Sequence, residues 1–198
     1  MLPARLTRVA FVLLVGAVVA CDVSTVPKAT YSSPLGTYTL TSLTNGAPTE
    51  PNAIGFLLGA TRASASFGFD LLFDLDANGL PVIYPVRYVG GALAGTLKRI
   101  GMQVVPGSFD ALRVVPVDGY DTLSVQHIAV GSAVAVELRD PNSCFSSTTL
   151  QLQNLYAKFV VDSVNKATRH IYVRTVVDPN CSYRVVVPDS VPKGVDEP

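Results

Sequence analysis

The residues of this chain best suited to chemistry are the acidic and amide side chains at positions 74–79. The run Asp74-Leu75-Asp76-Ala77-Asn78-Gly79 places oxygen-bearing side chains at alternate positions and ends on glycine. This pattern is typical of the first half of a calcium-binding loop, in which oxygens at positions 1, 3 and 5 converge on the ion. The twelfth position is Pro85, which cannot supply the usual bidentate carboxylate. Two interpretations stay open: a calcium site at Asp74, Asp76 and Asn78, or a hairpin turn with solvated acidic side chains.

Asp70 extends the same acidic pattern along an expected strand. With Asp74 and Asp76 it forms a row on one strand face, which suits a bound cation or one carboxylate of a sugar-hydrolysing pair. Nothing in the sequence places a second carboxylate opposite this row. The row therefore predicts no defined active site.

Other catalytic patterns are missing from the sequence. The two histidines, His127 and His170, lie within expected strands, and neither is accompanied by a serine in a nucleophile motif. The sequence contains no His-Glu-x-x-His or Cys-x-x-Cys motif, and the glycine-rich stretch from Gly90 to Lys98 lacks the spacing of a phosphate loop. We expect a non-enzymatic protein without a required cofactor; a hydrolase is the less favoured alternative.

The N-terminus is typical of an export signal. Arg5 and Arg8 precede an apolar run from Val9 to Ala20, and twelve helical residues span about 18 Å, whereas a bilayer core is about 30 Å thick. A basic start, a short apolar run and a small residue at its end predict a cleaved signal peptide over residues 1–20. No other segment of the sequence is long and apolar enough to cross a membrane.

The end of this leader, Val18-Val19-Ala20-Cys21, resembles the bacterial lipobox. The resemblance covers residues 1–21 and implies cleavage before Cys21, diacylglycerol on its sulfur and frequent acylation of the new amine. Two or three acyl chains are sufficient for stable membrane anchoring. The alternative is ordinary secretion with a free Cys21. On the lipobox interpretation, the protein belongs to the cell envelope and faces the periplasm or the exterior.

The other two cysteines, Cys144 and Cys181, form an even pair in an exported protein. They close the segments Asp140-Pro141-Asn142-Ser143-Cys144 and Asp178-Pro179-Asn180-Cys181, both of which look like turns that leave a strand end. An even pair in an oxidising compartment predicts a disulfide.

Composition excludes several classes of partner. Removal of Arg5 and Arg8 lowers the 15 basic residues to 13 against 15 acidic ones, so the net charge is 13 − 15 = −2. This balance predicts no binding to nucleic acid and no electrostatic attachment to anionic lipid. The expected partners are the membrane, through the lipid, and an envelope protein or a glycan.

The mature chain has the pattern of an all-β domain, either an antiparallel sandwich or a barrel. We expect a flexible tether over residues 21–34 and a frayed polar tail over residues 189–198. Between them, residues 35–188 are expected to form a β-domain, with a split into two modules near residue 108 as the alternative. Alternating apolar residues predict the strands, whereas Leu97–Val105 is ambiguous between a strand and a helical turn. The expected strands are 36–43, 67–75, 82–88, 112–117, 122–128, 133–139, 156–164, 170–177 and 183–187.

Three dipeptides have the sequence of tight hairpin turns: Asn45-Gly46, Asn78-Gly79 and Asp118-Gly119. We expect the third to join the strands at 112–117 and 122–128. On the strand 82–88, Tyr84 and Tyr88 share a face, which is either a row of core residues or an exposed aromatic row suited to glycan stacking.

The body of the chain also resembles uncharacterised bacterial lipoproteins. The resemblance covers much of residues 67–187 and implies an envelope β-domain, but it carries over no catalytic residue because those proteins have no assigned activity. It rests on Phe73–Gly79, Val82–Arg87, Gly107–Ala111, Gly119-Tyr120, Tyr156–Val164 and Asp178–Cys181.

Overall fold

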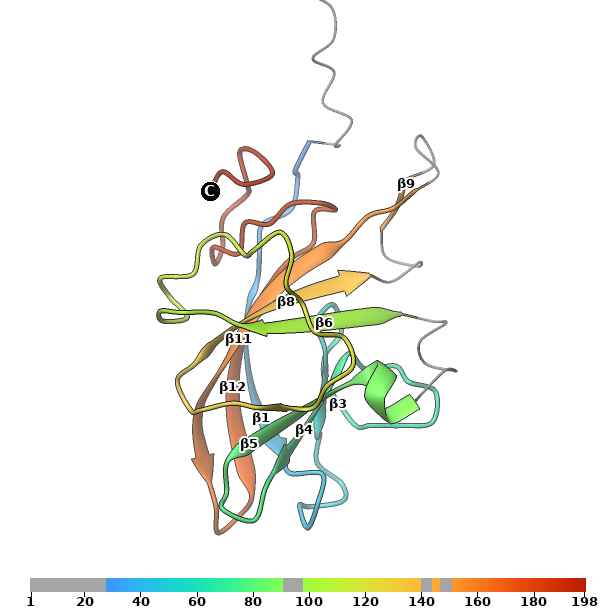
Figure 1. The fold of residues 1–198 in the computed structure, drawn as a ribbon, viewed down its shortest axis with the longest axis vertical. Helices are drawn as coiled ribbons and strands as arrows, with labels where there is room; N and C mark the ends of the chain where they lie inside the picture. The colour runs from blue at the N-terminus through green and yellow to red at the C-terminus, as the bar shows by residue number, and fades with distance from the viewer. Residues whose placement is uncertain (1–27, 91–97, 140–143, 147–150) are drawn as a thin grey trace, which may run out of the picture.

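The computed structural model describes residues 28–90, 98–139, 144–146 and 151–198, which fold into two five-stranded antiparallel sheets packed face to face (Figure 1). The all-β sandwich predicted from the alternating sequence is confirmed. The first sheet has the order β1 (Leu35–Thr41), β12 (His170–Asp178), β11 (Leu155–Asn165), β8 (Ala133–Arg139), β6 (Arg99–Val104). The second sheet has the order β3 (Gly59–Thr61), β2 (Ala53–Gly55), β4 (Leu71–Leu75), β5 (Pro81–Pro85), β7 (Gln126–His127).

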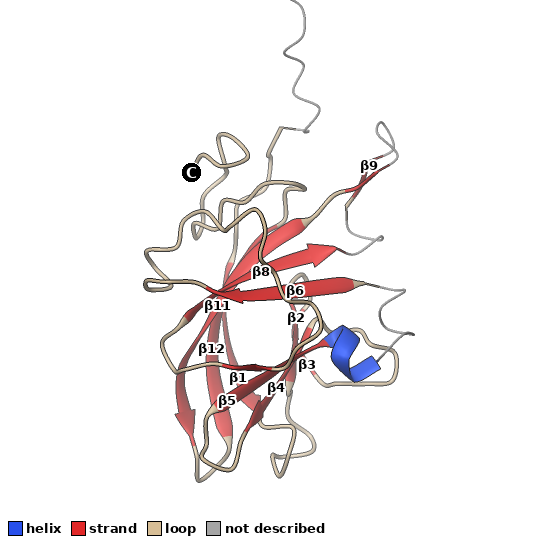
Figure 2. Cartoon of the chain, viewed as in Figure 1, coloured by secondary structure: helices blue, strands red, loops and turns tan. Residues whose placement is uncertain are grey.

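Two small elements complete the described structure. A two-stranded ladder pairs β9 (Phe145–Ser146) with β10 (Gln151–Leu152). Residues 86–90 are helical and follow directly on β5 (Figure 2). Among the described residues, no helix is both long enough and apolar enough to span a bilayer.

The main core lies between the two sheets. Phe73 of β4 and Phe159 of β11 meet edge to face there, with ring centroids 5.8 Å apart, a favourable aromatic geometry. The edges of the sheets also approach each other: a Cβ on Gly59 would lie 3.6 Å from the ring of Tyr38. This closure gives the sandwich a barrel-like side.

A second, smaller core covers the outer face of the first sheet. Residues 105–121 and the C-terminal segment cross that face, and Phe109, Val115 and Val186 pack on strand residues such as Val160 and Val176. The first sheet is therefore covered on its outer face over β8, β11 and part of β12, whereas alternate residues of β1 stay exposed. Because both sheets combine strands from before and after residue 108, a cut there would divide each of them.

The long hairpins follow the sequence predictions. β11 and β12 pair across the turn at residues 166–169, and β4 pairs with β5 across Asn78-Gly79, whose glycine has a φ of +75°. β8 has the predicted bounds, and the ambiguous stretch 97–105 contains β6. Local alternation and turn chemistry were sufficient for these elements.

Other predicted strands are wrong in extent or in pairing, and of the predicted strand 122–128 only β7 (Gln126–His127) forms, paired with β5. Asp118-Gly119 does make a turn, but its flanks do not pair with each other: Val114 bridges Val185, and Asp121 bridges Met102 of β6. Pro116 lacks the N–H that a ladder needs, and the apolar side chains of this segment cover the outer face of the first sheet instead. The predicted strand 183–187 contributes the single bridge at Val185.

Two predicted strand boundaries and one predicted hairpin also need correction. The predicted strand 67–75 begins at Leu71, since Phe67 adopts a positive φ of 52° and turns the chain. The predicted strand 82–88 ends at Pro85, and the chain then becomes helical. Asn45-Gly46 forms a turn but no hairpin, because β1 pairs with the distant β12.

The two terminal segments are more ordered than the sequence predicts. Within the predicted tether, Ala29 and Ser33 are buried, and the Ser33 N–H donates to the Ser190 carbonyl. The predicted frayed tail folds back on the domain, where Asp196 pairs with Arg184 at 2.6 Å. Residues 1–27, and with them the predicted signal peptide and Cys21, lie outside the described residues.

Candidate functional site

A pocket of about 150 Å³ opens between the two sheets. Buried Leu138 of β8 and Leu155 of β11 form its inner wall. Leu57 and Leu58, on the turn between β2 and β3, form part of the rim and are 49% and 79% exposed. Its remaining lining residues are Gly55, Gly68, Asp70 and Lys98.

An ion pair forms the polar part of this pocket. Lys98 Nζ lies 2.8 Å from Asp70 Oδ1, and both side chains are about nine-tenths buried. The second carboxylate oxygen of Asp70 accepts the Phe56 N–H at 2.7 Å. The pair is electrically neutral and bonded on both oxygens, so the pocket combines an aliphatic wall with one fixed dipole.

The predicted acidic row is divided among three unconnected environments. Asp70 faces the pocket, whereas both oxygens of Asp74 are bonded to the segment that follows β1. Asp76 caps its own turn by accepting the N–H groups of Asn78 and Leu80, each at 2.8 Å. The alternative of a hairpin with solvated carboxylates is wrong for Asp74, which is 6% exposed, and Asp70 is similarly buried at 7%.

We call Ser42, Thr44, Asp74 and Arg169 the turn cluster. Ser42 Oγ, Thr44 Oγ1 and the N–H groups of Thr44 and Leu75 donate to the carboxylate of Asp74, and an Arg169 nitrogen lies 3.5 Å from it. Burial alone would raise the pKa of Asp74, but these hydrogen bonds outweigh it and lower that pKa. Arg169 also donates to the Thr44 and Leu75 carbonyls, so the cluster joins the loop after β1, the end of β4 and the turn before β12.

The side chains proposed to bind calcium, Asp74, Asp76 and Asn78, do not converge on one point. Both oxygens of Asp74 accept hydrogen bonds within the turn cluster, and Oδ1 of Asp76 accepts two from its own turn. Within the described ranges, no group of three histidine, cysteine or acidic side chains is arranged to hold a metal ion. The backbone carbonyl of Asn78 accepts a hydrogen bond from Lys166 Nζ at 2.6 Å.

The two histidines lie apart from the pocket. His127 is exposed on β7. His170 contacts a hydroxyl and a carboxylate, with Nδ1 3.1 Å from Thr168 Oγ1 and Nε2 2.7 Å from Glu50 Oε2. This resembles the order of groups in a nucleophilic triad, but it lies at a surface turn and shares no residue with the pocket.

The predicted aromatic row is divided by the end of β5. Val82 and Val86 are buried and Tyr84 packs partly against the core, whereas Tyr88 is 55% exposed on the helical residues 86–90. The rings of Tyr84 and Tyr88 remain in contact, with centroids 5.7 Å apart. The pair therefore has one core-facing ring and one ring open to solvent.

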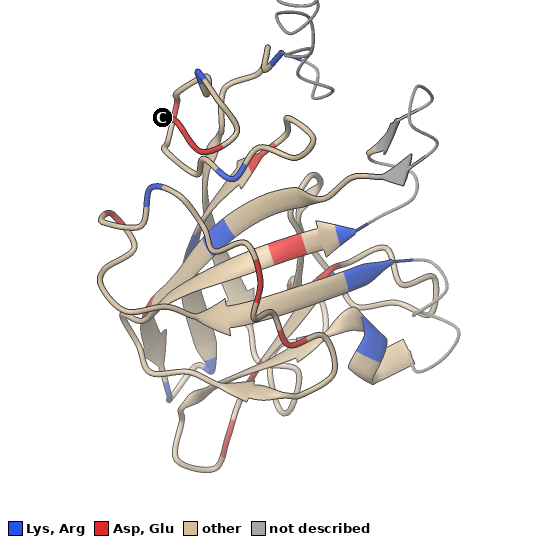
Figure 3. Cartoon of the chain, turned by 45° about the horizontal axis from the view of Figure 1, so that its top comes forward, with Lys and Arg blue, Asp and Glu red and all other residues tan. Residues whose placement is uncertain are grey.

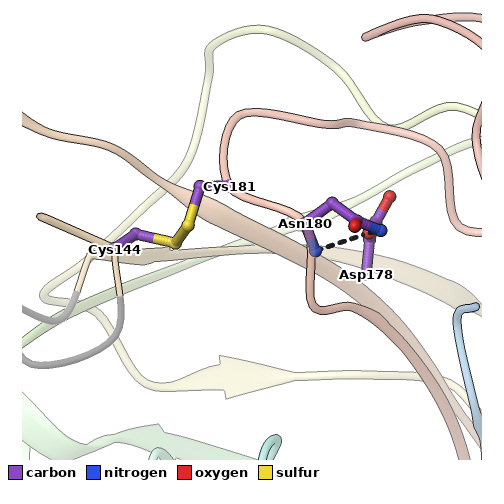
Figure 4. Close-up of a disulfide and its surroundings, with 4 residues drawn as sticks. All are labelled: Cys144, Asp178, Asn180 and Cys181. Atoms are coloured by element: carbon purple, nitrogen blue, oxygen red, sulfur yellow. Dashed lines mark hydrogen bonds between the residues drawn. A yellow bond between two sulfur atoms is a disulfide. The ribbon is translucent and has the colours of Figure 1, made fainter. Parts of the chain in front are cut away.

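We call Cys144, Asp178, Asn180 and Cys181 the tether junction (Figure 4). The predicted disulfide is confirmed: Cys144 and Cys181 are bonded, with Cα atoms 5.7 Å apart. Asn180 Oδ1 accepts the N–H groups of Thr30 and Tyr31 at 2.8 and 3.1 Å. The junction thus fixes the segment through which the described domain connects to the predicted anchor.

Asp178 is a buried carboxyl with one bonded oxygen. Its Oδ1 accepts the backbone N–H and the side-chain amide of Asn180, at 2.8 and 2.7 Å, while the buried Oδ2 has no partner among the described residues. Burial raises the pKa of Asp178 to about 6, against the lowering effect of the Asn180 hydrogen bonds. The carboxyl therefore titrates close to neutrality.

Lys158 is a buried cation on the outer face of the first sheet. Its Nζ donates to the carbonyls of Phe109 and Leu112, both at 2.7 Å, and lies 4.4 Å from the Phe109 ring centroid. The Arg174 guanidinium lies 4.8 Å from the centroid of the same ring and pairs with Asp162. Burial lowers the pKa of Lys158 to about 8. These contacts fasten the covering segment 105–121 to the sheet.

Charged residues of both signs are interspersed over the loops and the strands of the described chain (Figure 3). Comparison of the chain with protein-family models, curated protein sequences and solved structures gives no match. No residue role is therefore transferred from a relative, and the resemblance to bacterial lipoproteins stays a prediction.

The sequence did not point to the pocket, to Lys98 or to Lys158. Lys98 ends the glycine-rich stretch that lacks the spacing of a phosphate loop, Gly68 lies in the predicted strand 67–75, and Gly55 belongs to no motif. They meet Leu138 and Leu155 only through the packing of the two sheets. The available signal for Lys158 was its position at the centre of an apolar strand, where a charge needs a partner.

Proposed function

We propose that this protein is a lipid-anchored lipoprotein of the bacterial cell envelope whose β-domain binds a partner or acts structurally, without catalysis. The observation that carries this proposal is the Cys144–Cys181 disulfide. Intramolecular structural disulfides persist mainly in exported proteins, which is the compartment that the predicted leader and Cys21 imply.

The tether junction supports the same proposal. Asn180 and the Tyr183 hydroxyl bind the backbone of residues 29–31, next to the disulfide. A domain joined to a membrane through its N-terminus transmits any pull on the anchor through this segment. The disulfide beside this segment would resist such a pull, because it limits how far the end of β12 can separate from Cys144.

The anchor is tested by fractionation of cells that produce the Cys21→Ser variant. We expect wild-type protein in the membrane fraction and Cys21→Ser either released in processed form or retained as an uncleaved precursor. The matched control is the Cys144→Ser/Cys181→Ser double variant, which loses two cysteines but keeps the anchor. Membrane retention of fully processed Cys21→Ser would refute the proposed lipidation.

A glycan is the second partner class that a specific observation favours. Tyr88 offers an exposed ring braced by Tyr84, and sugars stack on such rings. We expect Tyr88→Ala to lose binding to peptidoglycan fragments while Tyr31→Ala, at another exposed tyrosine, retains it. Equal binding by wild type and both variants, or by none of them, would remove this candidate.

A further inference from the structure

We propose that the pocket between the sheets receives one uncharged aliphatic side chain of a partner polypeptide, of leucine size. The proposal concerns the β-domain alone and holds whether or not Cys21 carries lipid. It rests on the volume of the pocket, its lining, its neutral ion pair and the exposed apolar rim.

The volume limits the occupant. At about 150 Å³, the pocket lies well below the 300–1,000 Å³ typical of cofactor and drug-sized ligand sites. An apolar cavity of about this size accommodates a ligand as small as benzene. One branched aliphatic side chain fits these dimensions, and an anchor residue in a fitted pocket is the usual centre of a protein interface.

The lining selects an aliphatic occupant. Leu138 and Leu155 offer methyl groups from the first sheet, whereas Gly55 of β2 and Gly68, in the segment before β4, line the other side without side chains. Among the described residues that line the pocket, none carries an aromatic ring that could stack on a sugar or a nucleobase. Dispersion and the hydrophobic effect are thus the main attractive forces available to the occupant.

The Asp70–Lys98 pair selects against charge. A carboxylate ligand would compete with Asp70 for Lys98, and an ammonium ligand would compete with Lys98 for Asp70. Either would leave a buried charge without its partner, which disfavours binding. A neutral side chain meets no such cost, and the backbone amide of the residue that carries it can hydrogen-bond at the polar side of the pocket.

The rim favours a polypeptide over a free small molecule. Leu57 and Leu58 extend apolar surface outward from the mouth, and their exposed fractions of 49% and 79% leave much of it in water. A molecule confined to the pocket would leave that surface wet. A chain that crosses the rim covers it, with its leucine inserted between the sheets.

The first test is a titration followed by protein NMR with four probes: N-acetyl-leucine-N-methylamide, the matched glycine compound, 4-methylpentanoate and isopentylamine. We expect saturable shifts at Gly55, Gly68 and Leu155 with the blocked leucine alone. Preferred binding of either charged probe, or equal shifts from the glycine compound, would overturn the proposal.

Substitutions of the ion pair sharpen the charge argument. Lys98→Met leaves the Asp70 carboxylate unpaired, so we expect affinity for isopentylamine to rise about tenfold. Asp70→Asn leaves Lys98 unpaired and keeps an acceptor for the Phe56 N–H, so affinity for 4-methylpentanoate should rise by a similar factor. Unchanged selectivity in both folded variants would contradict a ligand site beside the pair.

A short blocked alanine–serine peptide with one central leucine tests whether the aliphatic group comes from a polypeptide or from a free small molecule. We expect it to bind about tenfold more tightly than blocked leucine, because it also covers the rim. Leu58→Ser should remove that advantage, whereas Leu80→Ser, at an exposed leucine outside the pocket, should retain it. A peptide that binds no better than blocked leucine would contradict a polypeptide occupant.

Discussion

The turn cluster and the tether junction lie near the two ends of β12, and each contains a buried aspartate. Asp74 receives donors on both carboxylate oxygens, whereas Asp178 receives donors on one. The pKa of Asp74 is lowered, and that of Asp178 is raised to about 6. The difference teaches that hydrogen-bond donors, rather than burial alone, decide which of the two buried carboxyls stays ionised.

The two regions also differ in how they join distant segments. The turn cluster connects the loop after β1, the end of β4 and the turn before β12 through hydrogen bonds to the Asp74 carboxylate, which are sensitive to the protonation of that group. The tether junction combines Asn180 with a disulfide, which is sensitive to redox conditions. The following changes test this contrast.

The largest expected effect comes from the disulfide. Cys144→Ser/Cys181→Ser should lower the free energy of unfolding by about 3–4 kcal/mol, because the unfolded chain regains the entropy of a loop with a sequence separation of 37. For a domain of this size the melting temperature should fall by roughly 10 °C. Calorimetry with and without reductant measures it; an equal response of the double variant to reductant would contradict a role for the bridge.

Asp74→Ala should have the next largest effect, a loss of about 3 kcal/mol. Its removal leaves the donors of Ser42 and Thr44, the Leu75 N–H and the Arg169 guanidinium without their acceptor. The wild-type contribution should be complete above about pH 4, the unfolded-state value, and should disappear as pH falls through the lowered folded-state pKa.

Urea titrations between pH 2 and pH 7 measure this contribution. The same experiment with and without calcium tests the metal hypothesis. We expect the wild-type protein to be equally stable with and without calcium. The matched control Asp76→Ala should lose about 1 kcal/mol of unfolding free energy, because the Asp76 side chain caps a single exposed turn. Calcium-dependent stabilisation that Asp74→Ala abolishes would reinstate a metal site.

Asp178→Asn should reveal the opposite pH dependence. Because the folded-state pKa is raised to about 6, the folded protein binds this proton more tightly than the unfolded chain does. The group's contribution to stability should therefore increase as pH falls from about 6 to about 4, by roughly 2 kcal/mol. The difference in unfolding free energy between wild type and Asp178→Asn isolates it, and a flat difference across this range would contradict the assignment.

Lys158→Met extends the comparison to a buried cation and should have the smallest net effect, about 1–2 kcal/mol. The variant leaves the Phe109 and Leu112 carbonyls without a donor but removes the cost of burying a charge. Since the folded-state pKa is lowered to about 8, wild-type stability should rise as pH increases from 8 to 10.5. Lys158→Met should lack this rise in denaturant titrations, and its persistence would assign the rise to another group.

Much of the fold could be predicted from the sequence because it is local. Alternation and an Asn-Gly turn were sufficient for β4 and β5, and two adjacent apolar runs for β11 and β12. The cysteine pair was predictable from its count and its two Asp-Pro-Asn flanks. The pairing of β1 with β12 was not predictable, since no local pattern links residues so far apart.

The candidate sites were less predictable because they depend on contacts between distant segments. The alternation of residues 67–75 indicated which side chains share a face, but not that both faces of β4 are covered. Arg169 and Lys98, which contact Asp74 and Asp70, lie directly before β12 and β6 of the opposite sheet. The sequence therefore offered a solvated acidic row where the structure has two buried, separately bonded carboxylates.

The most direct test of the anchored, oxidised domain is intact mass spectrometry of the protein extracted from its native membranes. The account predicts a chain that begins at Cys21, carries diacylglycerol on that cysteine, and lacks two hydrogens because of the Cys144–Cys181 bond. A chain that begins at Met1, carries no lipid and has three titratable thiols would contradict it.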